Sequence, residues 1–145
     1  MPVRTARTTW NGGLRDGSGT VTLTSSGAGS YEVNFPKRAA DDADGTTSPE
    51  ELIAAAHAGC FAMQFSAMLG AAGGHDQSLD VTADVTLGPD PAGGFRISGI
   101  ALSVSGSAQG VSAEDFARIA VDAKAACPVS KALAGTSISL DVFNR

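Results

Sequence analysis

The sequence predicts an α+β fold in which antiparallel strands pack around a central helix. Three observations support this fold class. Residues 4–35 alternate polar with β-branched or aromatic side chains, residues 52–72 carry no charge, and residues 80–105 resume the alternation. The length of 145 residues suits one domain, predicted over residues 1–145, that buries a core without disulfide or metal staples.

The charge balance excludes two classes of partner. Lys and Arg total 10 against 15 Asp and Glu, for a net charge of −5, so we expect neither nucleic acid nor an anionic membrane surface as a partner. Charged residues make up 17% of the chain, a low share which predicts that part of the surface is covered in an oligomer. The first residues contain no apolar signal segment, so the expected compartment is the cytoplasm, and two cysteines are too few for a disulfide scaffold.

The N-terminal third predicts a small sheet followed by a loop. Within residues 4–35, three short runs of Thr, Val and aromatic residues are separated by glycine-rich stretches, which is typical of a three-stranded antiparallel meander. Residues 36–47 are polar and acidic and carry no periodic apolar pattern. We expect this segment to be a loop, a place where functional residues often lie.

A long helix is predicted next, over residues 49–72. Ser48 and Glu51 have the spacing of a capping box, in which the side chain of each residue accepts a hydrogen bond from the backbone N–H of the other. The uncharged run over residues 52–72 is long enough to cross a membrane. We prefer a central helix of a folded domain, touched on all sides, because His57 and several glycines and polar residues interrupt the run.

The C-terminal half predicts four more elements in chain order: a hairpin over residues 80–105, a helix over 113–127, a helical turn over 128–134 and a closing strand over 137–143. Phe116 and Cys127 are 11 residues apart, which at about 100° per residue puts them within about 20° of the same helix face. We therefore expect Cys127 to point into the core.

Cys60 is the first candidate for chemistry, but its own helix does not activate it. No cation lies within a helical turn of it, so burial is expected to raise the pKa of its thiol and leave it inert. An arginine from elsewhere in the fold, Arg38 or Arg15, could stabilise the thiolate. The plainer alternative is that both arginines are solvated loop residues and that both cysteines are inert core thiols.

Two rival sites use His57. His57 and Cys60 share a helix face, and with His75 and Cys127 they could bind zinc, but they match no recognised ligand spacing. A Cys–His acyl-transfer pair is also disfavoured, because the helix supplies no third group to orient the histidine. We therefore favour a core histidine at position 57 and expect no metal.

Two segments resemble the motifs of a known family. Ser48 to Met63, which contains Cys60, and Ala126 to Leu133, which contains Cys127, are similar to the two cysteine motifs of the OsmC/Ohr family of thiol peroxidases. Further similar segments extend the resemblance over nearly the full length: Trp10 to Gly12, Gly17 to Val21 and Thr82 to Val85.

The resemblance implies a fold, an activity and partners. It implies an intertwined homodimer in which antiparallel sheets from both chains wrap around two central helices. It implies that Cys60 reduces organic hydroperoxides, and hydrogen peroxide less well, becoming a sulfenic acid that Cys127 resolves as a disulfide. A dithiol, of the lipoyl type in many members, would be the reductant, and no bound cofactor or metal is expected.

The resemblance also assigns supporting residues. The segment Tyr31 to Arg38 is similar to the OsmC branch, which implies that Arg38 serves Cys60, whereas the Ohr branch would use Arg15; we prefer Arg38. By similarity Glu50 would anchor the guanidinium. Apolar neighbours of Cys60 would favour organic substrates: Phe61, Met63, Phe65 and Met68. The alternative from another class is a non-catalytic dimer that binds a small lipid or serves a structural role.

Overall fold

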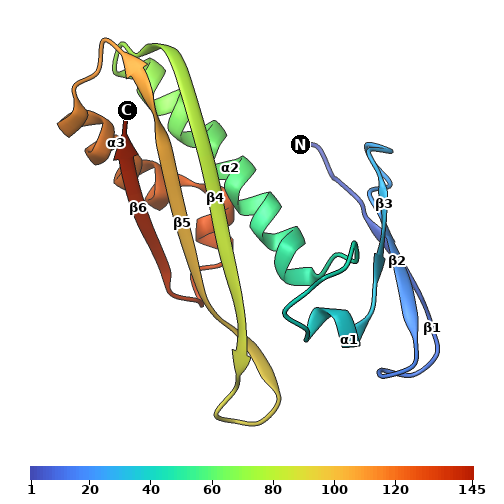
Figure 1. Ribbon diagram of the computed structural model, residues 1–145. Coiled ribbons are helices and arrows are strands. Elements are labelled where there is room, and N and C mark those ends of the chain that lie inside the picture. Colours follow the sequence, from blue (N-terminus) through green and yellow to red (C-terminus); the bar gives the residue numbers. More distant parts are fainter. The chain divides into compact units, whose positions relative to one another are not determined.

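The computed structural model describes residues 1–145 as two compact units, Met1–Pro49 and Glu50–Arg145 (Figure 1). Each unit contains a three-stranded sheet, and helices complete the chain. The α+β class predicted from the sequence is therefore confirmed. The single domain over residues 1–145 stays a prediction.

The first unit is built on an antiparallel meander. Strands β1 (Arg7–Asn11), β2 (Ser18–Thr22) and β3 (Ser30–Val33) pair in the order β1-β2-β3, within the predicted range. The turn between β1 and β2 requires glycine, because Gly12 has a φ of +90° and a Cβ there would lie 2.8 Å from the Gly17 Cα. This turn presents Arg15 on its exposed side.

A short helix, α1 (Phe35–Arg38), lies inside the segment that the sequence predicts to be a loop over 36–47. The prediction was wrong at this end of the loop. Asn34 caps the helix by accepting a hydrogen bond of 2.9 Å from the Lys37 N–H, and a proline in the first turn has the fixed φ that a helix start favours. The alternation of β3 runs into Phe35 and hides this start, so α1 is a single turn that pattern alone misses.

The sheet of the second unit joins β4 (His75–Pro89), β5 (Phe95–Gln109) and β6 (Ile138–Asn144) in that order. β4 and β5 form an antiparallel hairpin, and β6 runs parallel to β5. The hairpin is longer than the predicted 80–105. Its outer residues are polar and small and show no apolar alternation, yet the backbone ladder continues through Ser78 paired with Ser107 and, past a bulge, to His75.

Three helices complete this unit: α2 (Pro49–Ala71), α3 (Ala113–Ala126) and α4 (Pro128–Ala132). Ser112 caps α3 by accepting a hydrogen bond of 3.1 Å from the Asp115 N–H, as its capping pattern indicates. Figure 1 shows α2 and α3 running along the β4-β5-β6 sheet. One core joins residues of α2, β5, α3 and the junction of α3 with α4: Phe61, Phe65, Leu69, Leu102, Val104, Ala108, Phe116, Ile119, Ala120, Ala123 and Cys127.

Within one chain, α2 is covered along one stripe. The helix buries His57, Phe61, Phe65 and Leu69, which recur every four residues, whereas Met63 is 70% exposed. The sequence predicts a helix touched on all sides, and a single chain does not provide that cover. The apolar composition of α2 therefore exceeds what the core of one chain uses.

By length and composition alone, α2 could also cross a membrane. Its most apolar window has a mean hydropathy of 1.5 and is 22% buried. Core helices of soluble proteins pass the same test, and the fully buried His57, Phe61 and Phe65 belong to the stripe that meets the sheet unit. We therefore describe α2 as a core helix with a second apolar face.

Candidate active site

The structure brings the two cysteines together. Cys60 lies near the middle of α2 and is partly buried, whereas Cys127 is fully buried at the junction of α3 and α4. Their Sγ atoms are 3.3 Å apart, although 67 residues separate them in the chain. Both are free thiols, and a disulfide would need the sulfurs to approach to about 2.05 Å.

The backbone around Cys127 explains its inward direction. Its N–H bonds the Ala123 carbonyl at 2.8 Å and closes α3, while its own carbonyl accepts the Lys131 N–H at 3.0 Å and opens α4. Pro128 begins α4 because its ring suits the first turn and cannot continue α3. The sequence prediction that Cys127 faces the core is confirmed by its exposure of 0%.

Burial raises the pKa of the Cys60 thiol, as its uncharged helix predicts. The N–H of Val129 opposes this shift by hydrogen bonding to the sulfur, and the neighbouring Cys127 raises the pKa further. The groups that face Cys60 in this unit therefore favour the neutral thiol.

Burial also raises the pKa of Cys127, but hydrogen bonds outweigh it and the net shift is downward. The donors are the N–H and the hydroxyl of Ser130, the Cys60 thiol and the N–H of Val129. The contact between the two sulfurs thus acts in opposite directions, raising the pKa of Cys60 and lowering that of Cys127.

His57 is the buried core histidine that the sequence favours. Its exposure is 0%, and its Nε2 lies 2.7 Å from the hydroxyl oxygen of Ser130. Burial lowers the pKa of His57, so the ring is neutral at pH 7. Sequence reasoning missed Ser130, although its position three residues after Cys127 in the second cysteine motif was the available signal.

Neither rival site built on His57 is assembled. No group of three or more His, Cys, Asp or Glu side chains is arranged to hold a metal ion. His75, the other histidine of the zinc hypothesis, instead pairs with Asp76 at 3.0 Å on the surface. The His57 ring bonds Ser130 rather than Cys60, so the pair lacks the histidine–thiol contact that acyl transfer needs.

The remaining predicted site residues lie at defined places in their own units. Arg38 is the last residue of α1 and is half-buried, whereas Arg15 is exposed in the β1–β2 turn. Glu50 is in the first turn of α2 and is 8% exposed. Their roles toward Cys60 stay predictions.

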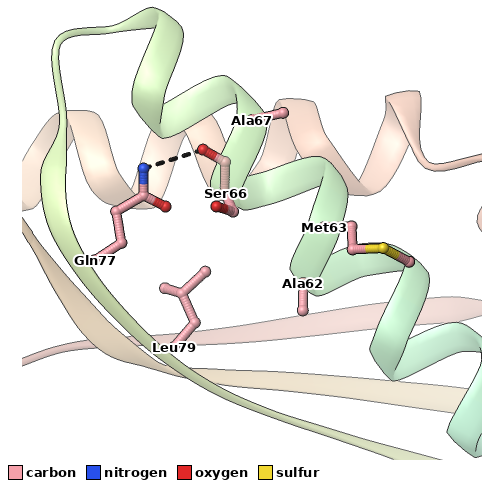
Figure 2. Close-up of a pocket in the computed structure, with 6 residues that line it drawn as sticks. All are labelled: Ala62, Met63, Ser66, Ala67, Gln77 and Leu79. Atoms are coloured by element: carbon pink, nitrogen blue, oxygen red, sulfur yellow. Dashed lines mark hydrogen bonds between the residues drawn. The ribbon is translucent and has the colours of Figure 1, made fainter.

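A hollow of about 490 Å³ lies between α2 and β4. Figure 2 shows the six residues that line it, with the Gln77 side-chain amide donating to the Ser66 carbonyl at 3.1 Å. Met63, one of the four apolar residues expected to select organic substrates, lines this hollow. Phe61 and Phe65 do not serve that purpose, because both rings are fully buried in the core.

Comparison with known proteins places these cysteines in a family context. Residues 41–142 match the family model described as OsmC-like protein. The chain is 43% identical over 132 residues to "Peroxiredoxin OsmC" of Escherichia coli (strain K12), which spans 91% of this chain and 90% of that protein. It is 37% identical over 100 residues to "Organic hydroperoxide resistance protein OhrA" of Bacillus subtilis (strain 168), spanning 66% and 67% of the two chains.

Solved structures agree with this relationship. An organic hydroperoxide resistance protein from Elizabethkingia anophelis superposes with a TM-score of 0.71 at 28% identity, covering 99% of each chain. OhrB of Bacillus subtilis superposes with a TM-score of 0.68 at 25% identity, covering 97% of this chain and 98% of that one. The resemblance carried by the two cysteine motifs is confirmed.

Proposed function

The chain belongs to the OsmC family and is a peroxidase, and we propose that it reduces organic hydroperoxides through a sulfenic acid on Cys60 and a disulfide between Cys60 and Cys127. The observation that carries this proposal is the distance of 3.3 Å between the two sulfurs. Access supports the division of roles, because Cys60 is partly exposed and Cys127 is fully buried.

The reaction has two chemical steps. The Cys60 thiolate attacks the distal oxygen of the hydroperoxide, the O–O bond breaks, and the alkoxide leaves and takes a proton to become the alcohol. The Cys127 thiolate then attacks the sulfenic sulfur, the S–S bond forms, and the departing hydroxide takes up the proton that the Cys127 thiol gave up. One molecule of hydroperoxide thus oxidises two thiols to a disulfide, and the products are an alcohol and water.

Arg38 is our candidate for activating Cys60. A guanidinium beside the thiolate would lower its pKa, against the burial that raises it, and would polarise the O–O bond of the substrate. Glu50 would hold that guanidinium. Residue similarity to the OsmC branch supports Arg38 over Arg15.

A homodimer would complete the site. Glu50 and Cys60 are ten residues apart on the continuous helix α2, which is roughly 15 Å along the axis at about 1.5 Å per residue. We propose that Glu50 reaches the site from the partner subunit, with the two α2 helices packed antiparallel about a two-fold axis. The uncovered apolar face of α2, with Met63 at 70% exposure, supports an obligate interface of well above roughly 2,000 Å².

The proposed cycle closes with an external reductant. A dithiol of the lipoyl type would reduce the disulfide by thiol exchange, and no bound cofactor or metal takes part. We place this cycle in the cytoplasm, where thiol reductants are abundant.

A turnover assay tests the proposal. Purified protein is given cumene hydroperoxide with dihydrolipoamide, thioredoxin or glutathione, and its free thiols are counted before and after one equivalent of peroxide. We expect two thiols to disappear per chain and turnover to be fastest with the dithiol. Unchanged thiols, together with binding of a fatty acid in the hollow between α2 and β4, would establish the alternative of a non-catalytic lipid-binding dimer.

A further inference from the structure

A buried polar pair lies behind Cys127, and the proposed reaction leaves it without a role. His57 of α2 is 0% exposed and Ser130 of α4 is 7% exposed. The His57 Nε2 and the Ser130 Oγ are 2.7 Å apart, a short hydrogen bond between residues 73 positions apart in the chain. Burying these polar groups in an apolar core is costly unless each is bonded, so the pair calls for a physical reason.

Ser130 connects the pair to the reacting sulfurs. Hydrogen bonding from its N–H and its hydroxyl is among the causes that lower the pKa of Cys127, which precedes it by three residues in the chain and lies 3.3 Å from Cys60. A continuous polar chain therefore runs from His57 through Ser130 and Cys127 to Cys60. On the side of the core the surroundings are apolar, since Phe61 and Ala123 are fully buried there.

The chemistry of each group fixes the direction of the hydrogen bonds. A serine hydroxyl has one proton, so when Ser130 donates it to the Cys127 sulfur its oxygen must accept from His57. The neutral ring of His57 then carries its proton on Nε2 and leaves Nδ1 as an acceptor. Nδ1 is buried with no partner in the chain, and a buried unpaired acceptor costs less than a buried unpaired N–H. In this series of hydrogen bonds, His57 therefore donates to Ser130 and Ser130 donates to Cys127.

We propose that His57 and Ser130 are positioning residues that hold the Cys127 sulfur as a thiolate in the two steps where it carries negative charge. This inference rests on the proposed function and deepens it. In disulfide formation, the Cys127 thiolate attacks the Cys60 sulfenic sulfur, the S–S bond forms and hydroxide departs. In reduction of the disulfide, the reductant's thiolate attacks the Cys60 sulfur, the S–S bond breaks, and Cys127 leaves with the electron pair.

Exposure selects which sulfur the reductant attacks. Cys127 is fully buried, so an incoming thiolate reaches the partly exposed Cys60. Exchange is faster when the departing sulfur is the more stable thiolate, and the donors around Cys127 give it that property. The same hydrogen bonds thus serve Cys127 as nucleophile and as leaving group.

Other charged groups near Ser130 must be held constant in a test. Lys124 and Lys131 line, with Ser130, a hollow of about 260 Å³, and the Lys124 ammonium donates to the Ile138 carbonyl at 2.9 Å. From α2, Cys60 faces Cys127 directly, and His57 contacts Ser130. A test that changes only Ser130 or His57 leaves both lysines in place.

The decisive measurement is the thiolate absorbance of Cys127 at about 240 nm against pH, in a Cys60→Ser background where it is the remaining cysteine. Adding Ser130→Ala should raise the midpoint by about one pH unit, or about tenfold in the ionisation constant. Ser130→Thr, which keeps the hydroxyl, should restore it. His57→Leu should raise the midpoint less, and His57→Gln, which keeps an N–H donor, should restore it. Ser139→Ala on β6, at an exposed position, is the matched control.

Single-turnover kinetics in the full-length protein supply a second readout. With both cysteines present, Ser130→Ala should leave sulfenic acid formation unchanged and slow disulfide closure about threefold at neutral pH. The thiolate fraction falls about tenfold while the sulfur's intrinsic nucleophilicity rises about threefold. Selective slowing of the second step is not expected from a general loss of stability.

The outcomes separate this inference from the proposed function. An unchanged midpoint in both Ser130→Ala and His57→Leu overturns the inference, even if the protein is an active peroxidase. A raised midpoint that Ser130→Thr and His57→Gln restore supports the inference, and it can be obtained without any turnover. Should Ser130→Ala fail to fold, the His57→Leu and His57→Gln pair decides the matter in the same assay.

Discussion

Cys60 and Cys127 are neighbours in space but occupy different kinds of backbone. Around Cys60 the N–H groups of α2 are already used in intrahelical hydrogen bonds, so burial dominates and raises the pKa of its thiol. Cys127 precedes α4, whose first N–H groups, on Val129 and Ser130, have no intrahelical acceptor and bond its sulfur. The position along a helix therefore decides which hydrogen-bond donors reach each of two adjacent thiols.

This difference places opposite demands on the two residues in the proposed reaction. Most of the donors that lower the pKa of Cys127 come from its own loop, on Val129 and Ser130. Cys60 is the sulfur that a peroxide can reach, yet it must receive its activation from another part of the protein. We therefore expect the reactivity of Cys60 to depend on a cation from another part of the protein.

Replacing each cysteine with serine should have the largest effect on turnover, and it tests the difference between Cys60 and Cys127. Cys60→Ser should abolish turnover, because the buried Cys127 cannot meet the hydroperoxide. Cys127→Ser should allow one oxidation and then trap a sulfenic acid or an intermolecular adduct, detectable by mass spectrometry after dimedone labelling. Equal residual turnover in the two variants would show that the different exposure of Cys60 and Cys127 does not make one the peroxide-reactive thiol and the other the resolving thiol.

Removing the cation that activates Cys60 should have the next largest effect. Arg38→Ala should move the thiol midpoint of Cys60 to or above about 8.5, and the peroxidase rate at pH 7 should fall about tenfold for each pH unit by which that midpoint rises. Iodoacetamide reactivity against pH measures this, and Arg15→Ala is the matched variant. If Arg15→Ala raises the midpoint and Arg38→Ala does not, the chain uses the arrangement of the Ohr branch.

A mixed dimer tests whether the site of Cys60 is shared between subunits. Chains carrying Cys60→Ser are combined with chains carrying Glu50→Ala by unfolding and refolding both together. If Glu50 serves the partner's Cys60, one site of the mixed dimer holds both lesions and the other holds neither, so about half of the activity per mixed dimer should return. Recovery that does not exceed the inactive parents, or a fully active monomer, contradicts the shared site.

Local signals predicted most of the fold. The capping patterns at Ser48 and Ser112 predicted the starts of α2 and α3, because capping depends on residues adjacent in sequence. The one-turn helix α1 and the outer ends of the β4–β5 hairpin escaped prediction, since neither shows an apolar period. The one-sided burial of α2 escaped it as well, because composition reports how apolar a helix is and not which partner covers it.

The candidate site divides in the same way. The sequence identified Cys60 and Cys127 through motif resemblance, and helix periodicity predicted that Cys127 faces inward. The bond between His57 and Ser130 joins residues 73 positions apart, and no local rule pairs them. What sequence reasoning could offer was their spacing, three residues before one cysteine and three after the other.

The smallest expected effect is on the pH dependence of stability, and it concerns His57. Burial lowers the pKa of His57, so the native protein resists its protonation while the unfolded chain takes up a proton near pH 6.5. The unfolded state then binds more protons, and the free energy of unfolding decreases as the pH falls below about 6.5. His57→Gln should flatten this loss between about pH 7.5 and about pH 5.5, measured from urea midpoints, whereas His75→Gln at an exposed site should leave it in place. An equal slope in the wild-type and His57→Gln proteins would mean that burial does not lower the pKa of His57 in the native state, and it would contradict this prediction.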